Sequence, residues 1–171
     1  MSAYHRVTRQ CALGELRSEL LRAVRDHARQ VGAGELDDDV EICCETRSEI
    51  SDPGRVASWL VGDPDQVHYS AVILTSNWLV WARSGAKTEA VAASAQLNSL
   101  RVTVRASPHS QEIEMEVAGI FGNSQRQIRG LLAFGAEPAA QKICDKVVAA
   151  AERMNPRPKR KPLRIFGIPI G

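Results

Sequence analysis

The chain has 171 residues, of which 44% are hydrophobic and 25% charged, and its net charge is +2 at pH 7. These values are typical of one ordinary globular domain with room for a hydrophobic core. No run of about 18 apolar residues occurs, which excludes a membrane-spanning helix, and residues 1–6 lack the apolar core of a secretory signal. We therefore expect a cytoplasmic protein.

The charge is unevenly distributed along the chain. All 20 acidic residues precede Asn155, whereas five of the 22 basic residues follow it, so residues 1–155 carry a net charge of −3 and the remainder +5. A mildly acidic body is a poor surface for nucleic acid, and we expect no nucleic-acid partner.

The first predicted element is a helix over residues 13–31. Leu16, Leu20, Val24 and Val31 recur at helical spacing on one face, and charged residues cover the other. Gly32 ends the pattern.

Seven strands are predicted after this helix, because short apolar or alternating segments are separated by turn residues. They span residues 40–50, 67–74, 78–83, 89–96, 99–106, 111–118 and 127–134.

The second and third of these strands form a predicted hairpin. Thr75, Ser76 and Asn77 separate two apolar runs, which is a hairpin signal. Trp78 and Trp81 lie on opposite faces of the second strand, so at least one of them faces away from the interior of the sheet. It either packs under the N-terminal helix or marks an exposed recognition patch.

A final helix is predicted over residues 138–154. Pro138 suits the first helical position, and Asn155 with Pro156 stops the helix. Ile143 and Val147 belong to its apolar stripe and are expected to be buried against the sheet.

The order of strands with a terminal helix, together with the hairpin at residues 74–82, resembles the bacterial pleckstrin-homology-like domains. The resemblance covers about residues 40–154. It implies an α+β fold: a curved, seven-stranded antiparallel sheet or barrel, capped by the C-terminal helix, with an extra N-terminal helix. Residues 1–155 would form this single domain, and residues 156–171 a basic and apolar tail.

The same resemblance implies a non-enzymatic interaction module that binds a protein or peptide partner. Lipid-binding members carry a basic cluster on the first interstrand loop, where this chain has Arg55 among Asp52, Asp63 and Asp65. The alternative is a helix-grip protein that carries or converts a small ligand in an apolar cavity between sheet and final helix.

No motif indicates a catalytic site, a cofactor or a metal centre. Phosphate-binding, dinucleotide-binding, hydrolase and zinc-protease signatures are missing, so we expect no enzyme and assign no catalytic, cofactor or metal-binding residue. The acidic residues 37–41 lack the spacing of a calcium loop. Cys11, Cys43, Cys44 and Cys144 are interpreted as small hydrophobes, with a zinc site or a disulfide as the alternative, and Cys43 and Cys44 are placed on opposite faces of a strand.

The residues that we expect to bind a partner lie in two segments. Trp59, next to Leu60 and Val61, is a candidate surface anchor. The tail combines basic and apolar candidates, namely Arg157, Lys159, Arg160, Lys161, Arg164, Ile165, Phe166 and Ile168. Three interpretations of the tail stay open: a peripheral contact with an anionic membrane, addition as a strand to a sheet edge, and a disordered end.

Overall fold

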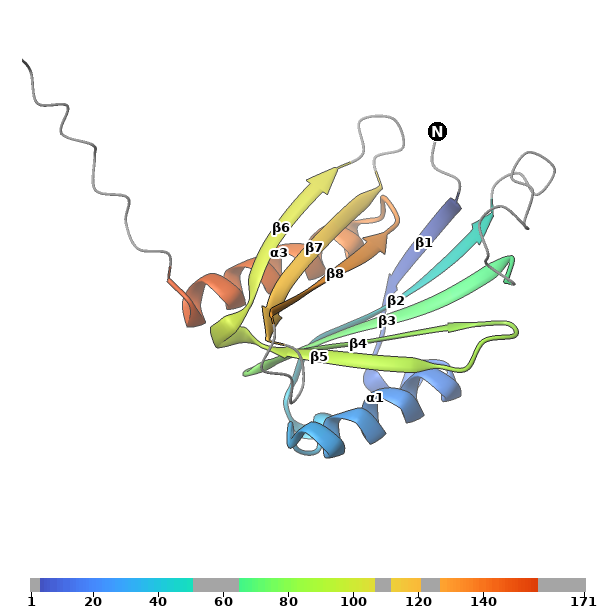
Figure 1. The fold of residues 1–171 in the computed structure, drawn as a ribbon. Coiled ribbons are helices and arrows are strands. Elements are labelled where there is room, and N and C mark those ends of the chain that lie inside the picture. Colours follow the sequence, from blue (N-terminus) through green and yellow to red (C-terminus); the bar gives the residue numbers. More distant parts are fainter. Residues whose placement is uncertain (1–3, 51–64, 107–111, 121–126, 157–171) are drawn as a thin grey trace, which may run out of the picture.

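The computed structural model describes residues 4–50, 65–106, 112–120 and 127–156. Ten regular elements lie in these ranges, apart from short 3-10 turns (Figure 1). They are β1 (Tyr4–Gln10), α1 (Ser18–Val31), β2 (Val40–Ile50), β3 (Val67–Thr75), β4 (Trp78–Gly85), β5 (Val91–Gln96), β6 (Arg101–Ala106), β7 (Ile113–Ile120), β8 (Gln127–Phe134) and α3 (Pro138–Met154).

The fold is α+β, with two antiparallel sheets. One sheet has the strand order β1-β2-β3-β4-β5 and the other β6-β7-β8. Within the described ranges the strands form these two open sheets rather than a closed barrel, so the barrel form of the expectation is not confirmed. None of the helices in these ranges is long and apolar enough to cross a membrane.

All seven predicted strands are present, with bounds that differ by no more than two residues. The predicted hairpin is confirmed: β3 and β4 pair antiparallel, with Leu74 opposite Leu79, and only Ser76 and Asn77 lie between the strands. The final helix has the predicted bounds, and Ile143 and Val147 are fully buried.

Strand β1 was not predicted, and it raises the number of strands in the described ranges to eight. It pairs antiparallel with β2 from Tyr4 opposite Ile50 to Gln10 opposite Cys44. Its inward positions include the polar residues Arg6 and Thr8, so its sequence lacks the alternation of apolar and polar residues that predicts a strand. The expected count of seven strands was therefore wrong.

The N-terminal helix begins later than predicted. Residues Leu13–Glu15 form a 3-10 turn, Leu16 is extended, and α1 starts at Ser18. The reason is a carboxylate from β2: Glu45 Oε2 accepts a hydrogen bond from the Arg17 backbone N–H at 2.9 Å. A carboxylate at this end also interacts favourably with the helix dipole.

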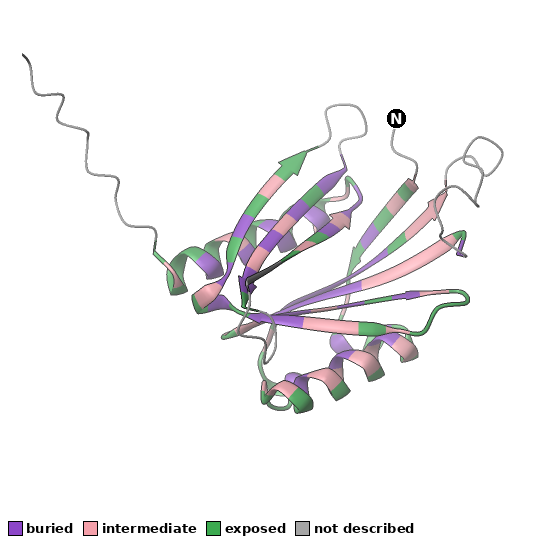
Figure 2. Cartoon of the chain, in the orientation of Figure 1, coloured by how far each residue is buried: buried purple, intermediate pink, exposed green. Residues whose placement is uncertain are grey.

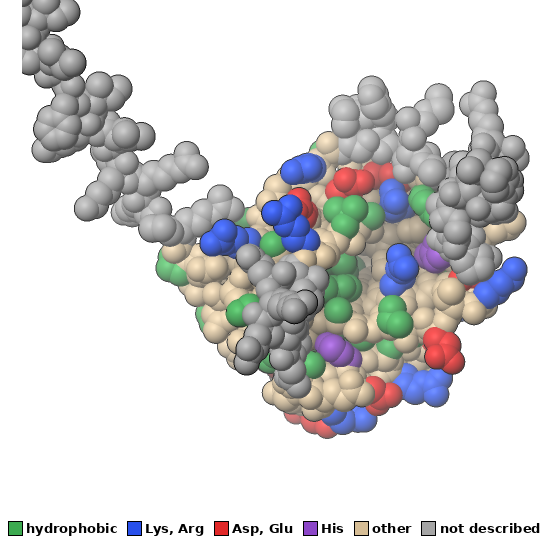
Figure 3. Space-filling model, in the orientation of Figure 1, with side chains coloured by type: hydrophobic (Ala, Val, Ile, Leu, Met, Phe, Trp, Pro, Cys, Tyr) green, Lys and Arg blue, Asp and Glu red, His purple; other side chains and the backbone are tan. Residues whose placement is uncertain are grey.

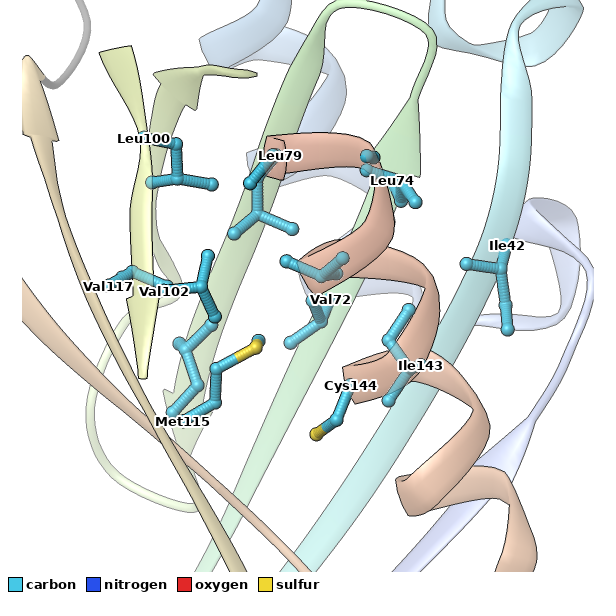
Figure 4. Packing of buried hydrophobic residues seen from close by; sticks show 14 of the residues in the cluster. Ile42, Val72, Leu74, Leu79, Leu100, Val102, Met115, Val117, Ile143 and Cys144 are labelled. Carbon is cyan, nitrogen blue, oxygen red and sulfur yellow. The ribbon is translucent and has the colours of Figure 1, made fainter. Parts of the chain in front are cut away.

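The five-stranded sheet is the central layer of the molecule, with a separate core on each face (Figures 1 and 2). On the outer face, α1 places Leu20, Val24 and Ala28 against Ile73 and Val80. On the inner face, α3 and the three-stranded sheet enclose the larger core. Figure 4 shows members of this core, including Ile42, Val72, Leu74, Leu79, Met115 and Ile143.

The two tryptophans of β4 follow the predicted alternation. Trp78 packs against the α1 core, and Trp81 packs against the core on the inner face. Cys43 and Cys44 are divided in the same way between the two cores. The interpretation that one tryptophan lies under the N-terminal helix is therefore confirmed for Trp78.

Candidate functional site

The sequence-derived partner residues lie outside the described ranges. These are Trp59 and the tail residues Arg157, Lys159, Arg160, Lys161, Arg164, Ile165, Phe166 and Ile168. Their role stays a prediction, and the structure directs attention to two other surfaces.

The first surface is a cleft between the two sheets. The inner face of the central sheet changes character along its strands. Near α3 it carries the buried residues Leu74 and Leu79, and farther along it carries polar residues in paired rows. Beyond the part that packs against α3, this face and strand β8 of the second sheet line a hollow of about 430 Å³. We call this hollow the inter-sheet cleft; Figure 3 looks toward it. Its floor includes Arg6, Ser48, His68, Ser70, Trp81 and Arg83.

The walls of the inter-sheet cleft are apolar and come from the edge strands of both sheets. Val91 on β5 and Leu131 on β8 both line it, and each residue is 64% exposed. Arg6 forms an ion pair with Glu112 at 2.7 Å, with both side chains largely buried. Arg83 lies opposite Ser70 on β3 and Val91 on β5. The lining thus combines apolar walls with a polar, basic floor.

The second surface is a groove of about 400 Å³ between the edge strand β6 and α3, which we call the β6/α3 groove. Within the described ranges β6 pairs on one side only, with β7. Val102 of β6 and Val148 and Ala151 of α3 supply apolar lining, while Thr103 and Glu152 are exposed at the groove. No residue lines both this groove and the inter-sheet cleft.

The histidines do not form a catalytic arrangement in the described ranges. His27 Nε2 lies 3.0 Å from Ser94 Oγ, which is a hydrogen-bonding distance for a nucleophile and a base. Ser94, however, is fully buried beneath α1, so a substrate has no access to its hydroxyl group. His5 is exposed, His68 lies in the inter-sheet cleft, and His109 falls outside the described residues.

The burial of His27 makes stability depend on pH. Burial lowers the pKa of His27 below its usual value, so the folded protein favours the neutral ring. As the pH falls through the ordinary histidine pKa of about 6.5, the unfolded chain takes up a proton that the folded protein still resists. Stability from this residue is therefore present above that pH and lost below it.

We expect the thermal midpoint of the wild type to fall more steeply from pH 7.5 to 5.5 than that of His27→Gln. Glutamine keeps a hydrogen-bonding group and does not titrate. Scanning calorimetry of both proteins over this range measures the difference. An equal pH dependence of the two thermal midpoints would contradict this role of His27.

Two of the four cysteines, Cys11 and Cys43, lie close together in space. Cys11 Sγ lies 3.9 Å from Cys43 Sγ across the β1–β2 edge. Burial raises the pKa of Cys43 well above its usual value and that of both Cys44 and Cys144 to about 12, which keeps these thiols protonated and poorly nucleophilic. Among the residues that the structure describes, no group of three or more His, Cys, Asp or Glu side chains is placed to hold a metal ion.

Three of the acidic residues around the start of β2 have structural partners. Asp37 forms an ion pair with Arg25 of α1, and Asp39 Oδ2 accepts a hydrogen bond from the Ser76 hydroxyl group at 2.6 Å. Glu41 lies 3.6 Å from Arg153 of α3. These three carboxylates contact α1, the β3–β4 turn and α3.

Comparison of this chain with protein-family models, with curated proteins and with solved structures found no match.

Proposed function

We propose that this chain is a non-enzymatic interaction module that binds an extended peptide segment of a partner protein in the β6/α3 groove. The proposal depends on one observation: within the described ranges β6 pairs on one side only, and its other side lines a groove with the apolar residues Val148 and Ala151 of α3. Backbone N–H and C=O groups at a sheet edge pair readily with an added strand, and a flanking groove selects the side chains of that strand.

The arrangement of strands supports a pleckstrin-homology-like fold as part of this proposal. Strands β2–β5 belong to one antiparallel sheet and β6–β8 to the other, and α3 follows directly. Without β1, these elements have the order expected of such a domain: a four-stranded sheet, a three-stranded sheet and a final helix. On this interpretation β1 extends the first sheet and α1 covers its outer face.

The packing of α3 favours the module over the helix-grip alternative. A carrier would need an apolar cavity between the sheet and the final helix. Ile143 and Val147 are fully buried in the core between α3 and the sheets. Figure 4 shows Ile143 in this core with Leu74 and Met115. These side chains fill the space that a ligand would need.

The lining of the groove suits a peptide in extended conformation. Val148 and Ala151 lie on the helix side, and the edge of β6 on the other. A strand added along β6 would direct every second side chain toward α3. We therefore expect the partner segment to alternate small apolar residues with polar ones.

Filling the groove should weaken peptide binding. Glu152 is exposed at the groove, so Glu152→Trp is expected to block it without disturbing the core. Peptides of 12 residues, selected from a random library on the full-length protein, provide the probe. Their affinity, measured by fluorescence anisotropy, should fall at least tenfold in this variant.

The matched control is Glu114→Trp, which makes the same change at an exposed position of β7. This variant should bind the peptides within twofold of the wild type. Hydrogen exchange of the wild-type complex should show new protection in residues 101–106. Selected peptides that bind Glu152→Trp as tightly as the wild type, or that leave β6 unprotected, would refute the proposal.

The tail remains part of the proposed interaction surface on its sequence alone. Its five basic residues and its apolar side chains suit contact with a partner protein or with an anionic membrane at the protein's periphery.

A further inference from the structure

We propose that the inter-sheet cleft is a binding site for an apolar monocarboxylate, such as an unbranched fatty acid. This site is separate from the β6/α3 groove and independent of the proposed peptide binding, because no lining residue is shared. The volume, the exposed apolar walls and the charge of the cleft support the inference in turn.

The cleft has the size and the surface of a small-molecule site. Its volume of about 430 Å³ falls in the range of about 300–1,000 Å³ that is common for such sites. Val91 and Leu131 are 64% exposed, although large aliphatic side chains are usually buried. They belong to different sheets and both line the cleft, and Trp81 contributes to its floor. A hydrocarbon chain between them would remove this apolar surface from water.

The basic groups of the cleft indicate a single negative charge on the ligand. The described lining holds Arg6, His68 and Arg83 and no Asp or Glu. Glu112 already pairs with Arg6. Arg83 is exposed, and among the described residues no carboxylate lies within ion-pairing distance of it.

The position of Arg83 suits recognition of a carboxylate. A guanidinium group presents two parallel N–H donors that match the two oxygens of a carboxylate. Ser70 pairs with Arg83 from β3 and also lines the cleft, and Val91, opposite Arg83 on β5, starts the apolar wall. The ligand's head and chain would thus meet polar and apolar surface in neighbouring rows of one sheet.

The test uses dodecanoate as the probe, in isothermal titration calorimetry with the full-length protein below the concentration at which dodecanoate forms micelles. We expect saturable binding of one molecule per chain. Octanoate should bind more weakly, by up to about fourfold for each methylene that is no longer buried. Acetate lacks the hydrocarbon chain and 1-dodecanol lacks the carboxylate head group. Both should bind at least tenfold more weakly than dodecanoate.

Two charge variants test whether Arg83 binds the carboxylate head group. Arg83→Gln should weaken dodecanoate binding about 10- to 100-fold, because a hydrogen-bonded ion pair is lost. Arg105→Gln makes the same change on β6, outside the cleft, and should leave the affinity within twofold. Both side chains are exposed, so we expect both variants to fold, with thermal midpoints close to that of the wild type.

A third variant tests whether the apolar wall of the cleft binds the hydrocarbon chain. Leu131→Gln should weaken dodecanoate binding while leaving the weak binding of acetate unchanged. Glu152→Trp, which blocks the β6/α3 groove, should bind dodecanoate normally, so failure of the peptide proposal and failure of this one are distinguishable.

Three outcomes would overturn the inference. They are the absence of dodecanoate binding at 1 mM, equal affinity in Arg83→Gln and the wild type, and tighter binding of dodecyl phosphate than of dodecanoate. The last would show that the cleft prefers a phosphate head group.

Discussion

Replacing Ile143 with alanine is expected to lower the free energy of unfolding by about 2–5 kcal/mol. Ile143 is fully buried where α3 meets the inner face of the central sheet, in the cluster that holds Leu74 and Met115 (Figure 4). Removing its outer carbon atoms leaves a cavity that rigid strands on one side cannot fill. Urea denaturation followed by circular dichroism measures the change.

The control for this prediction is Glu152→Ala on the same helix. Glu152 is exposed, so its truncation should change the stability by no more than about 0.5 kcal/mol. An equal effect of both substitutions would show that α3 is not anchored through Ile143, and would remove the main argument against a cavity beneath the helix.

Replacing Gly135 with alanine is the second change with a large expected effect, a loss of about 1–3 kcal/mol through overpacking. An added Cβ atom would lie 2.6 Å from the backbone oxygen of Arg6 and would also overlap the Glu137 carboxylate. That carboxylate accepts a hydrogen bond from the Thr8 N–H at 2.9 Å, and the Gly135 N–H donates to Thr8 Oγ1 at 2.8 Å. The substitution would therefore push β1 away from the junction of β8 and α3.

Gly14→Ala provides the matched control. A Cβ atom at Gly14 meets nothing within 4 Å, and its φ is not in the left-handed region. Here alanine should leave stability unchanged or raise it by up to about 1 kcal/mol, since it restricts the unfolded chain. Amide exchange at Thr8 should accelerate in Gly135→Ala alone. Unchanged exchange there would refute the role of this junction.

The parts of the fold that follow hydrophobic periodicity were predictable from sequence. Each of the strands β2–β8 and helix α3 buries at least one face in a hydrophobic core. The apolar residues of that face recur at regular spacing in the sequence, so the element can be predicted without knowing which distant side chains it contacts. The stop of α1 at Gly32 was predictable for a local reason: Gly32 adopts a left-handed conformation with φ of 74°.

The parts that depend on distant partners were not predictable. Strand β1 buries Arg6 and Thr8, whose partners Glu112, Gly135 and Glu137 lie more than 100 residues away. The start of α1 depends on Glu45, which is 28 residues beyond Arg17. In neither case does the local pattern reveal the partner.

The candidate sites were missed for the same reason. Arg83, Val91 and Leu131 lie on three strands, and only the packing of one sheet against the other brings them to one cleft. Composition instead drew attention to Trp59 and to the tail, where unusual residues are clustered in the sequence.

The attachment of β1 also has a kinetic consequence during synthesis. Thr8 leaves the ribosome early, yet its partner Glu137 is made 129 residues later. At about 5–20 residues per second, this delay is about 6–26 s. During that time β1, which covers the edge of β2, lacks the hydrogen bonds that Gly135 and Glu137 make with Thr8. Such an edge is open to pairing with other chains, so the nascent protein is most vulnerable to aggregation before its last helix emerges.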